Sequence, residues 1–168
     1  MNDAAQPVAL KTELSLRTRA AARAALATGP VLWAALAALN LILFHGYIHQ
    51  GYPLTPAVQV TAGKMILDAL FCALPGALLA SAAGFALPRG PQQLIACGAA
   101  FLAGLWYGRE LIGSIYRVDF GTTWAFGEAA RDLAWHPAWG PVLTIGGLAL
   151  QMLLIRHLRA REDRPLTP

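Results

Sequence analysis

The segment ALFCALPGALLASAAGFALP, residues 69–88, contains no charged side chain and decides the fold of this chain. About 20 apolar residues in a helix are needed to cross the hydrocarbon core of a bilayer. Because lipid offers the backbone no hydrogen bonds, such a segment crosses as a helix. Together with the partly polar residues before it, it predicts a membrane span over residues 57–87. Pro75 lies inside this span, has no N–H and predicts a kink.

The composition of the whole chain is typical of a membrane protein. Of its 168 residues, 57% are hydrophobic and only 13% are charged, whereas charged residues make up about a quarter of a soluble domain. The net charge of +4 comes mostly from arginines that flank apolar runs. Nucleic-acid binding needs a basic face on a folded domain and is not expected. Cys72 and Cys97 lie inside apolar runs and are expected to behave as small buried hydrophobic residues.

Three further apolar runs complete an expected all-α bundle of four antiparallel transmembrane helices. The spans are expected over residues 30–50, 57–87, 92–116 and 141–158, within a domain of residues 29–160 that a polar tail, 161–168, follows. Gly29 and Pro30 mark the start of the first span, because proline is tolerated in the opening turn of a helix. Residues 1–28 are expected to form a basic amphipathic arm on the membrane surface, with a loosely ordered tail as the alternative. A short interfacial helix is expected over residues 123–134.

The distribution of lysine and arginine predicts which side each end of the chain faces. Basic residues lie in the arm, in the C-terminal tail and, as Arg89, in the turn between the second and third spans. The two loops expected on the other side of the membrane hold only Arg117 and Arg131, together with three acidic residues. Cytoplasmic segments of membrane proteins carry the excess of lysine and arginine. Both termini are therefore expected in the cytoplasm. The arginine-rich and alanine-rich usage favours a bacterial inner membrane.

Small residues recur at every fourth position on two of the expected spans. They are Gly76, Ala80 and Gly84 on the second span and Ala100, Gly104 and Gly108 on the third. Stripes of this kind let the backbones of membrane helices approach closely. They predict that the second and third spans pack against each other as a hairpin. The alternative is that glycine and alanine are simply common in membrane helices.

The expected topology gathers six ionisable residues near the outer membrane boundary. They are His45 and His49 at the end of the first span, Lys64 and Asp68 in the second, and Arg109 and Glu110 in the third. Ionisable groups within a membrane usually face a partner, a cavity or a transport path. The other interpretation is that these groups anchor helix ends. In that case Lys64 and Asp68 project beyond the lipid into water.

His45 and His49 are the candidate metal ligands. Residues four apart lie on one face of a helix, and imidazole nitrogens bind transition metals. Asp68 or Glu110 is expected to complete such a site, and haem or quinone bound between the spans is a further hypothesis. The sequence requires none of these cofactors. It also contains no phosphate-binding glycine loop, paired-aspartate protease motif or zinc-binding helix motif, so an enzyme is the less expected class.

Three functions remain open. The first is a structural, accessory or assembly subunit of a larger membrane complex of transporter or respiratory type, embedded in the bilayer beside another membrane protein or further copies of itself. The second is a metal-, haem- or quinone-binding protein that uses the outer polar residues. The third is a small self-contained transporter, for which only Asn40, Thr144 and Gln151 could line the inner half of a path.

In layout alone, the expected bundle resembles the small membrane subunit of tripartite periplasmic-binding transporters. That subunit also has four spans and both ends inside. The resemblance covers topology and no sequence motif: the acidic pair near the start of the second span is absent, and the inner loop, residues 87–91, is shorter.

Overall fold

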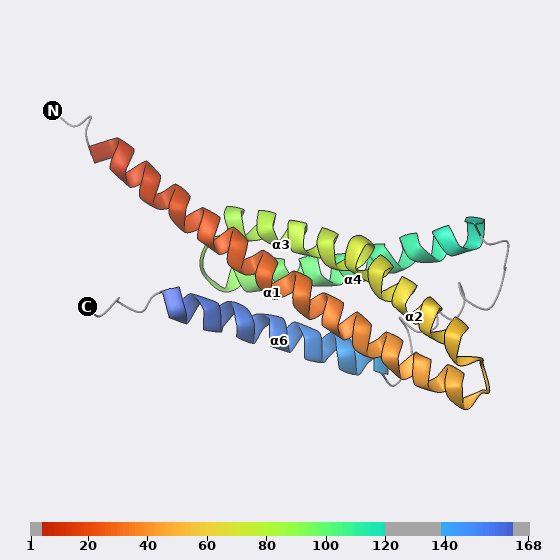
Figure 1. Cartoon of the computed structure of the whole chain (residues 1–168). Helices are drawn as coiled ribbons and strands as arrows, with labels where there is room; N and C mark the ends of the chain where they lie inside the picture. The colour runs from red at the N-terminus through yellow and green to blue at the C-terminus, as the bar shows by residue number, and fades with distance from the viewer. Residues whose placement is uncertain (1–4, 120–138, 163–168) are drawn as a thin grey trace.

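The computed structural model describes residues 5–119 and 139–162, and every regular element in these residues is a helix (Figure 1). The elements are α1 (Ala5–His49), α2 (Leu54–Asp68), the π-helical turn η1 (Ala69–Ala73), α3 (Leu74–Ala86), α4 (Pro91–Asp119) and α6 (Trp139–Glu162). The interfacial helix expected over residues 123–134 and most of the polar tail lie outside the described residues. The prediction of an all-helical chain is confirmed for the residues that the structure describes.

Three of the described helical segments are long and apolar enough to cross a membrane. They are Thr12–Gly46, Leu54–Ala86 and Trp139–Glu162. These segments overlap most of the first and second spans expected from the sequence and include the whole of the fourth. The side chains of α4 after Trp106 lie outside the described residues, so the span expected over residues 92–116 stays a prediction.

The first helix is longer than the sequence predicted. α1 continues without interruption from Ala5 to His49 and contains Pro30, so the helix boundary expected at Gly29 and Pro30 is absent. Ala20 and Ala24 are 1% and 0% exposed, and both lie against Gly84 of α3. Packing of the residues before Pro30 against α3 outweighs the hydrogen bond that proline removes. The second half of the expected surface arm is therefore part of the helical bundle.

The irregularity expected at Pro75 takes the form of a π-helical turn. The N–H of Leu74 donates to the carbonyl of Ala69, five residues earlier. Pro75 cannot donate to the carbonyl of Phe71, and in a regular α-helix its ring would clash with that carbonyl. A wider turn relieves this clash, and single π turns are a common cause of bends. Figure 1 shows α2 and α3 meeting at an angle at this turn.

Small residues form the closest contacts between the helices. A Cβ atom added to Gly104 would lie 2.8 Å from the carbonyl oxygen of Cys72 and from the Cα of Gly76, and one added to Gly84 would lie 2.6 Å from the carbonyl oxygen of Ala20. α3 and α4 therefore meet at Gly76 and Gly104, within the two stripes. Gly84, in contrast, faces α1, a partner that the sequence did not predict.

The core lies where α1, α3, α4 and α6 meet. One buried cluster consists of small residues and one isoleucine: Ala24, Ala27, Ala80, Cys97, Ala100 and Ile155. A second cluster, made of larger residues, consists of Val31, Leu32, Leu36, Cys72 and Phe101. Both cysteines are buried, and neither forms a disulfide bond. Five of the six small residues in the two stripes are buried. The burial of the sixth, Gly108, is not among the features that the structure describes.

Candidate functional site

A buried polar cluster lies where α1 meets the end of α2. Nδ2 of Asn40 donates a hydrogen bond of 2.6 Å to Oδ2 of Asp68, and Sγ of Cys72 lies 3.8 Å from Oδ1 of the same carboxylate. Asn40 and Asp68 are each 1% exposed, and Lys64, one turn earlier on α2, is 4% exposed. The interpretation in which Lys64 and Asp68 project into water is therefore wrong. α1 covers this face of α2 and supplies an amide that stabilises the carboxylate.

The position of this buried polar cluster along the bundle follows from helix geometry. Asn40 follows Arg23 on α1 by roughly 25 Å along the axis at 1.5 Å per residue. The hydrocarbon core of a bilayer is about 30 Å thick. The stretch of α1 between Arg23 and Asn40 carries no charged residue. Arg23 and the polar cluster therefore lie near opposite ends of the apolar part of the bundle.

His45 and His49 lie close together at the exposed end of α1. Their ring centroids are 4.7 Å apart in an edge-on arrangement, as the four-residue spacing predicts. Among the side chains that the structure describes, no group of three or more His, Cys, Asp or Glu residues could hold a metal ion. Asp68 therefore does not complete a metal site with the two histidines. The side chains of Arg109 and Glu110 lie outside the described residues.

A second set of buried polar contacts joins three helices. Nε2 of Gln151 on α6 donates to Oγ1 of Thr28 on α1 at 2.6 Å and to the carbonyl of Cys97 on α4 at 2.9 Å. Gln151 and Thr28 are both 0% exposed. Asn40 and Gln151, which a transporter would need along its path, are thus engaged in contacts between helices.

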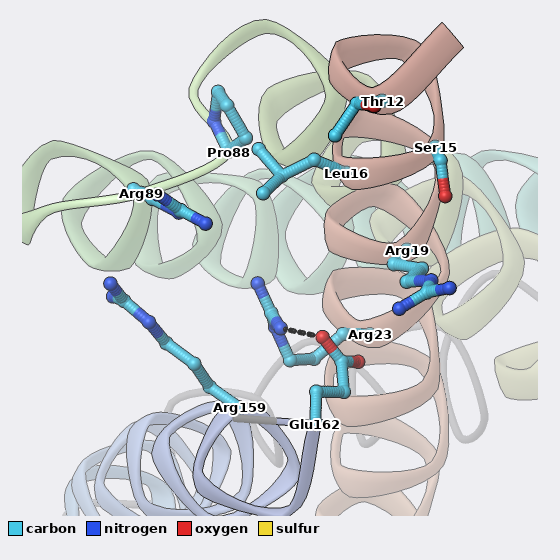
Figure 2. A pocket seen from close by; sticks show the side chains of 9 residues that line it. All are labelled: Thr12, Ser15, Leu16, Arg19, Arg23, Pro88, Arg89, Arg159 and Glu162. Atoms are coloured by element: carbon cyan, nitrogen blue, oxygen red, sulfur yellow. Dashed lines mark hydrogen bonds and ion pairs between the residues drawn. The ribbon is translucent and has the colours of Figure 1, made fainter. Parts of the chain in front are cut away.

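A cationic pocket of about 430 Å³ lies at the other end of the bundle. It is lined by Thr12, Ser15, Leu16, Arg19 and Arg23 of α1, by Pro88 and Arg89 of the turn between α3 and α4, and by Arg159 and Glu162 of α6. Figure 2 shows the guanidinium groups of Arg23, Arg89 and Arg159 directed into the same space from three different elements. We call this feature the cationic pocket.

Local structure explains how the three elements meet at the cationic pocket. α1 extends past the core because Ala20 and Ala24 pack on α3. Gly90 has a φ of +91°, a conformation that glycine adopts without a side-chain penalty, and it turns the chain from α3 into α4. Nη1 of Arg23 forms an ion pair of 2.5 Å with Oε2 of Glu162, which fixes the end of α6 to α1.

Among the described side chains that line the cationic pocket, positive charges outnumber negative ones. Four arginines and one glutamate line it, and that glutamate is engaged by Arg23. Arg23 is only 5% exposed, and its buried Nε atom has no hydrogen-bond partner among the residues that the structure describes. The sequence placed these arginines on one expected side of the membrane. It did not predict that residues from three separate segments enclose a pocket, because that depends on how α1 continues through Pro30.

Comparison of the chain with protein-family models, with curated proteins and with solved structures finds no match. Its function is therefore inferred from its own residues and contacts.

Proposed function

We propose that this chain is a structural, accessory or assembly subunit of a larger membrane complex. In this proposal the three described apolar helices and the apolar part of α4 form a four-span antiparallel bundle in a bacterial inner membrane. Both termini face the cytoplasm, because the arginine-rich cationic pocket lies at the end of the bundle that both termini share. The partner is another membrane protein or further copies of the chain.

Tight packing between the described helices is the observation that supports a structural role. A cavity of about 20 Å³ lies between Leu36, Phe101 and Thr144, and a volume of this order holds about one water molecule. The glycine contacts between α1, α3 and α4 leave no room for a side chain. Buried polar groups at two depths, Gln151 and Asn40, bind neighbouring helices. These features favour a rigid scaffold over a protein that opens a path for a solute.

Purification of the tagged chain from its native membrane tests the proposal. Cross-linking before extraction in mild detergent, followed by native mass spectrometry, should give an assembly larger than the 17.9 kDa chain, with one membrane partner in fixed ratio or a fixed number of copies. Removal of the chain should lower the amount of the assembled partner complex. A 17.9 kDa monomer without a cross-linked membrane partner would contradict the proposal.

A cofactor-binding protein is the second candidate, and the contact between His45 and His49 favours it. Two imidazoles on one helical face can share a transition metal, although the described side chains supply no third ligand. Absorbance spectra and elemental analysis of the purified chain decide between the two candidates. A bound metal or haem that is lost in His49→Ala supports this second function, and a colourless, metal-free protein rejects it.

A further inference from the structure

We propose that a groove between the start of α4 and the end of α6 binds the headgroup phosphate of an anionic phospholipid. The groove has a volume of about 330 Å³, and we call it the α4–α6 groove. It is lined by Pro91, Gln93 and Leu94 of α4 and by Ile155, Arg156 and Arg159 of α6. The site does not depend on the accessory role proposed above, because its evidence is the position, charge and burial of these residues.

The first argument is position. α6 is long and apolar enough to cross a membrane, and its uncharged stretch ends at Arg156, after residues 133–155 without a lysine, arginine or acidic residue. On α4, the uncharged stretch of residues 90–108 begins directly after Arg89. Figure 1 shows the start of α4 at the same end of the bundle as the C-terminal end of α6. The groove therefore lies at the boundary between apolar and charged sequence, where lipid headgroups lie.

The second argument is charge, which comes from a side chain and from a helix end. Arg156 is exposed, and a guanidinium group matches the geometry of phosphate oxygens. Pro91 is the first residue of α4, a helix of 29 residues. The first N–H groups of a helix have no acceptor within it, and this end carries partial positive charge that favours phosphate. Arg159 already has an interaction partner, so the site is not built on its charge.

The third argument is the buried amide of Gln93. This side chain lines the groove and is only 1% exposed, yet its Nε2 atom has no hydrogen-bond partner among the residues that the structure describes. A buried donor without an acceptor destabilises the fold. Because the last side-chain torsion of glutamine is broad, the amide can turn toward an oxygen atom held in the groove. A ligand oxygen would supply the missing acceptor.

The fourth argument is the apolar part of the lining, which favours a lipid over a soluble phosphate. Leu94 and Ile155 line the groove beside the polar residues. Exposed apolar side chains follow on both helices, among them Ile95 on α4 and Leu153 on α6. The acyl chains of a phospholipid can pack on such a surface while the phosphate lies beside Arg156. A soluble phosphate makes no use of it.

Two variants of α6 with equal loss of charge test the site. Arg156→Gln removes an arginine that lines the groove, whereas Arg161→Gln removes an exposed arginine of the last turn of α6 that does not line it. A third variant, Gln93→Leu, removes the buried amide and keeps a side chain of similar size. The full-length chain and the variants, purified in a neutral detergent at about 0.15 M salt, are titrated separately with short-chain phosphatidylglycerol, short-chain phosphatidylcholine and inorganic phosphate. Calorimetry measures binding, circular dichroism verifies the fold, and thermal unfolding without added lipid measures stability.

The wild-type chain should bind phosphatidylglycerol more tightly than phosphatidylcholine or inorganic phosphate. Arg156→Gln should bind phosphatidylglycerol about tenfold or more weakly, because a lost hydrogen bond between charged groups is worth about this factor. Arg161→Gln should stay within about twofold, since an exposed charge outside the groove is screened by salt. Gln93→Leu should bind about fivefold more weakly. Its stability without lipid should not fall, because the amide that it removes has no partner among the described residues.

Several results would overturn the proposal. One is that phosphatidylglycerol does not bind the wild-type chain, and another is that Arg156→Gln and Arg161→Gln lose affinity to the same extent. Binding of phosphatidylcholine as tight as that of phosphatidylglycerol would show that the groove does not select an anion. Equally tight binding of inorganic phosphate would assign the groove to a soluble phosphate. Wild-type affinity in Gln93→Leu would show that the buried amide does not contact the lipid.

Discussion

Nδ2 of Asn40 and Oδ2 of Asp68 lie 2.6 Å apart and form a hydrogen bond between α1 and the last residue of α2. The carboxylate is 1% exposed and is followed directly by the π-helical turn. A polar contact inside an apolar interface is satisfied in only one alignment of the two helices. This contact therefore fixes how far α1 is displaced along α2.

Replacement of Asn40 should destabilise the fold more than its size suggests. In Asn40→Ala the buried carboxylate of Asp68 loses a donor, and we expect a loss of about 1–3 kcal/mol in the free energy of unfolding. Denaturant unfolding in detergent measures this loss. Because the two residues are coupled, Asn40→Ala with Asp68→Ala should cost less than the sum of the single variants. Strictly additive effects would contradict the contact.

Gly84 and Gly63 form a matched pair of helical glycines. A Cβ at Gly84 would lie 2.6 Å from the carbonyl oxygen of Ala20 and 2.9 Å from the Cβ of Ala24, whereas one at Gly63 meets nothing within 4 Å. Gly84→Ala should therefore destabilise the protein by about 1–3 kcal/mol through overpacking. Gly63→Ala should stabilise it by about 0.5–1 kcal/mol, because alanine is the better helix former. Thermal unfolding of the two variants compares them directly, and equal shifts would refute the close approach of α1 and α3.

The contact between Gly147 of α6 and Phe101 of α4 predicts a compensating pair. A Cβ at Gly147 would lie 2.7 Å from Cζ of the Phe101 ring, which is 0% exposed. Gly147→Ala should cost about 1–3 kcal/mol. A second change, Phe101→Leu, should recover part of that stability although it is destabilising by itself. The four unfolding free energies form a cycle, and the absence of any recovery would argue against this packing.

Gln151 should contribute to stability through its bonds to Thr28 and the carbonyl of Cys97. Hydrogen bonds between membrane helices are worth roughly 0.6–2 kcal/mol, so we expect a loss of this size in Gln151→Ala. Gln92→Ala is the control, because Gln92 is exposed near the start of α4. If both variants unfold like the wild-type chain, the contact does not join the three helices.

The sequence predicted the apolar helices because hydrophobic length depends on local composition alone. It also located the irregularity near Pro75, since the loss of an N–H is a local property. It did not predict that α1 continues through Pro30, because that helix is held by Ala20 and Ala24 against Gly84, a contact between segments far apart in the chain.

The candidate sites depend on tertiary structure in the same way. Lys64 and Asp68 were visible in the sequence as ionisable residues beside an apolar run, but their burial depends on Asn40 of another helix. The cationic pocket combines residues of α1, α6 and the turn that contains Arg89. A count of basic residues on each expected side of the membrane was the available signal for it. That count predicts that these basic residues lie on the same side of the membrane, but it does not predict how their side chains are arranged.

The proposed arrangement in the membrane, with the cationic pocket and both termini on the cytoplasmic side, is tested most directly by reporter fusions. Reporters of cytoplasmic and of periplasmic location are attached before Met1, after Pro168 and at Gly51, which is exposed in the turn between α1 and α2. We predict that both terminal fusions report the cytoplasm and that the fusion at Gly51 reports the periplasm. Terminal reporters on opposite sides of the membrane, or a cytoplasmic signal from Gly51, would contradict this account.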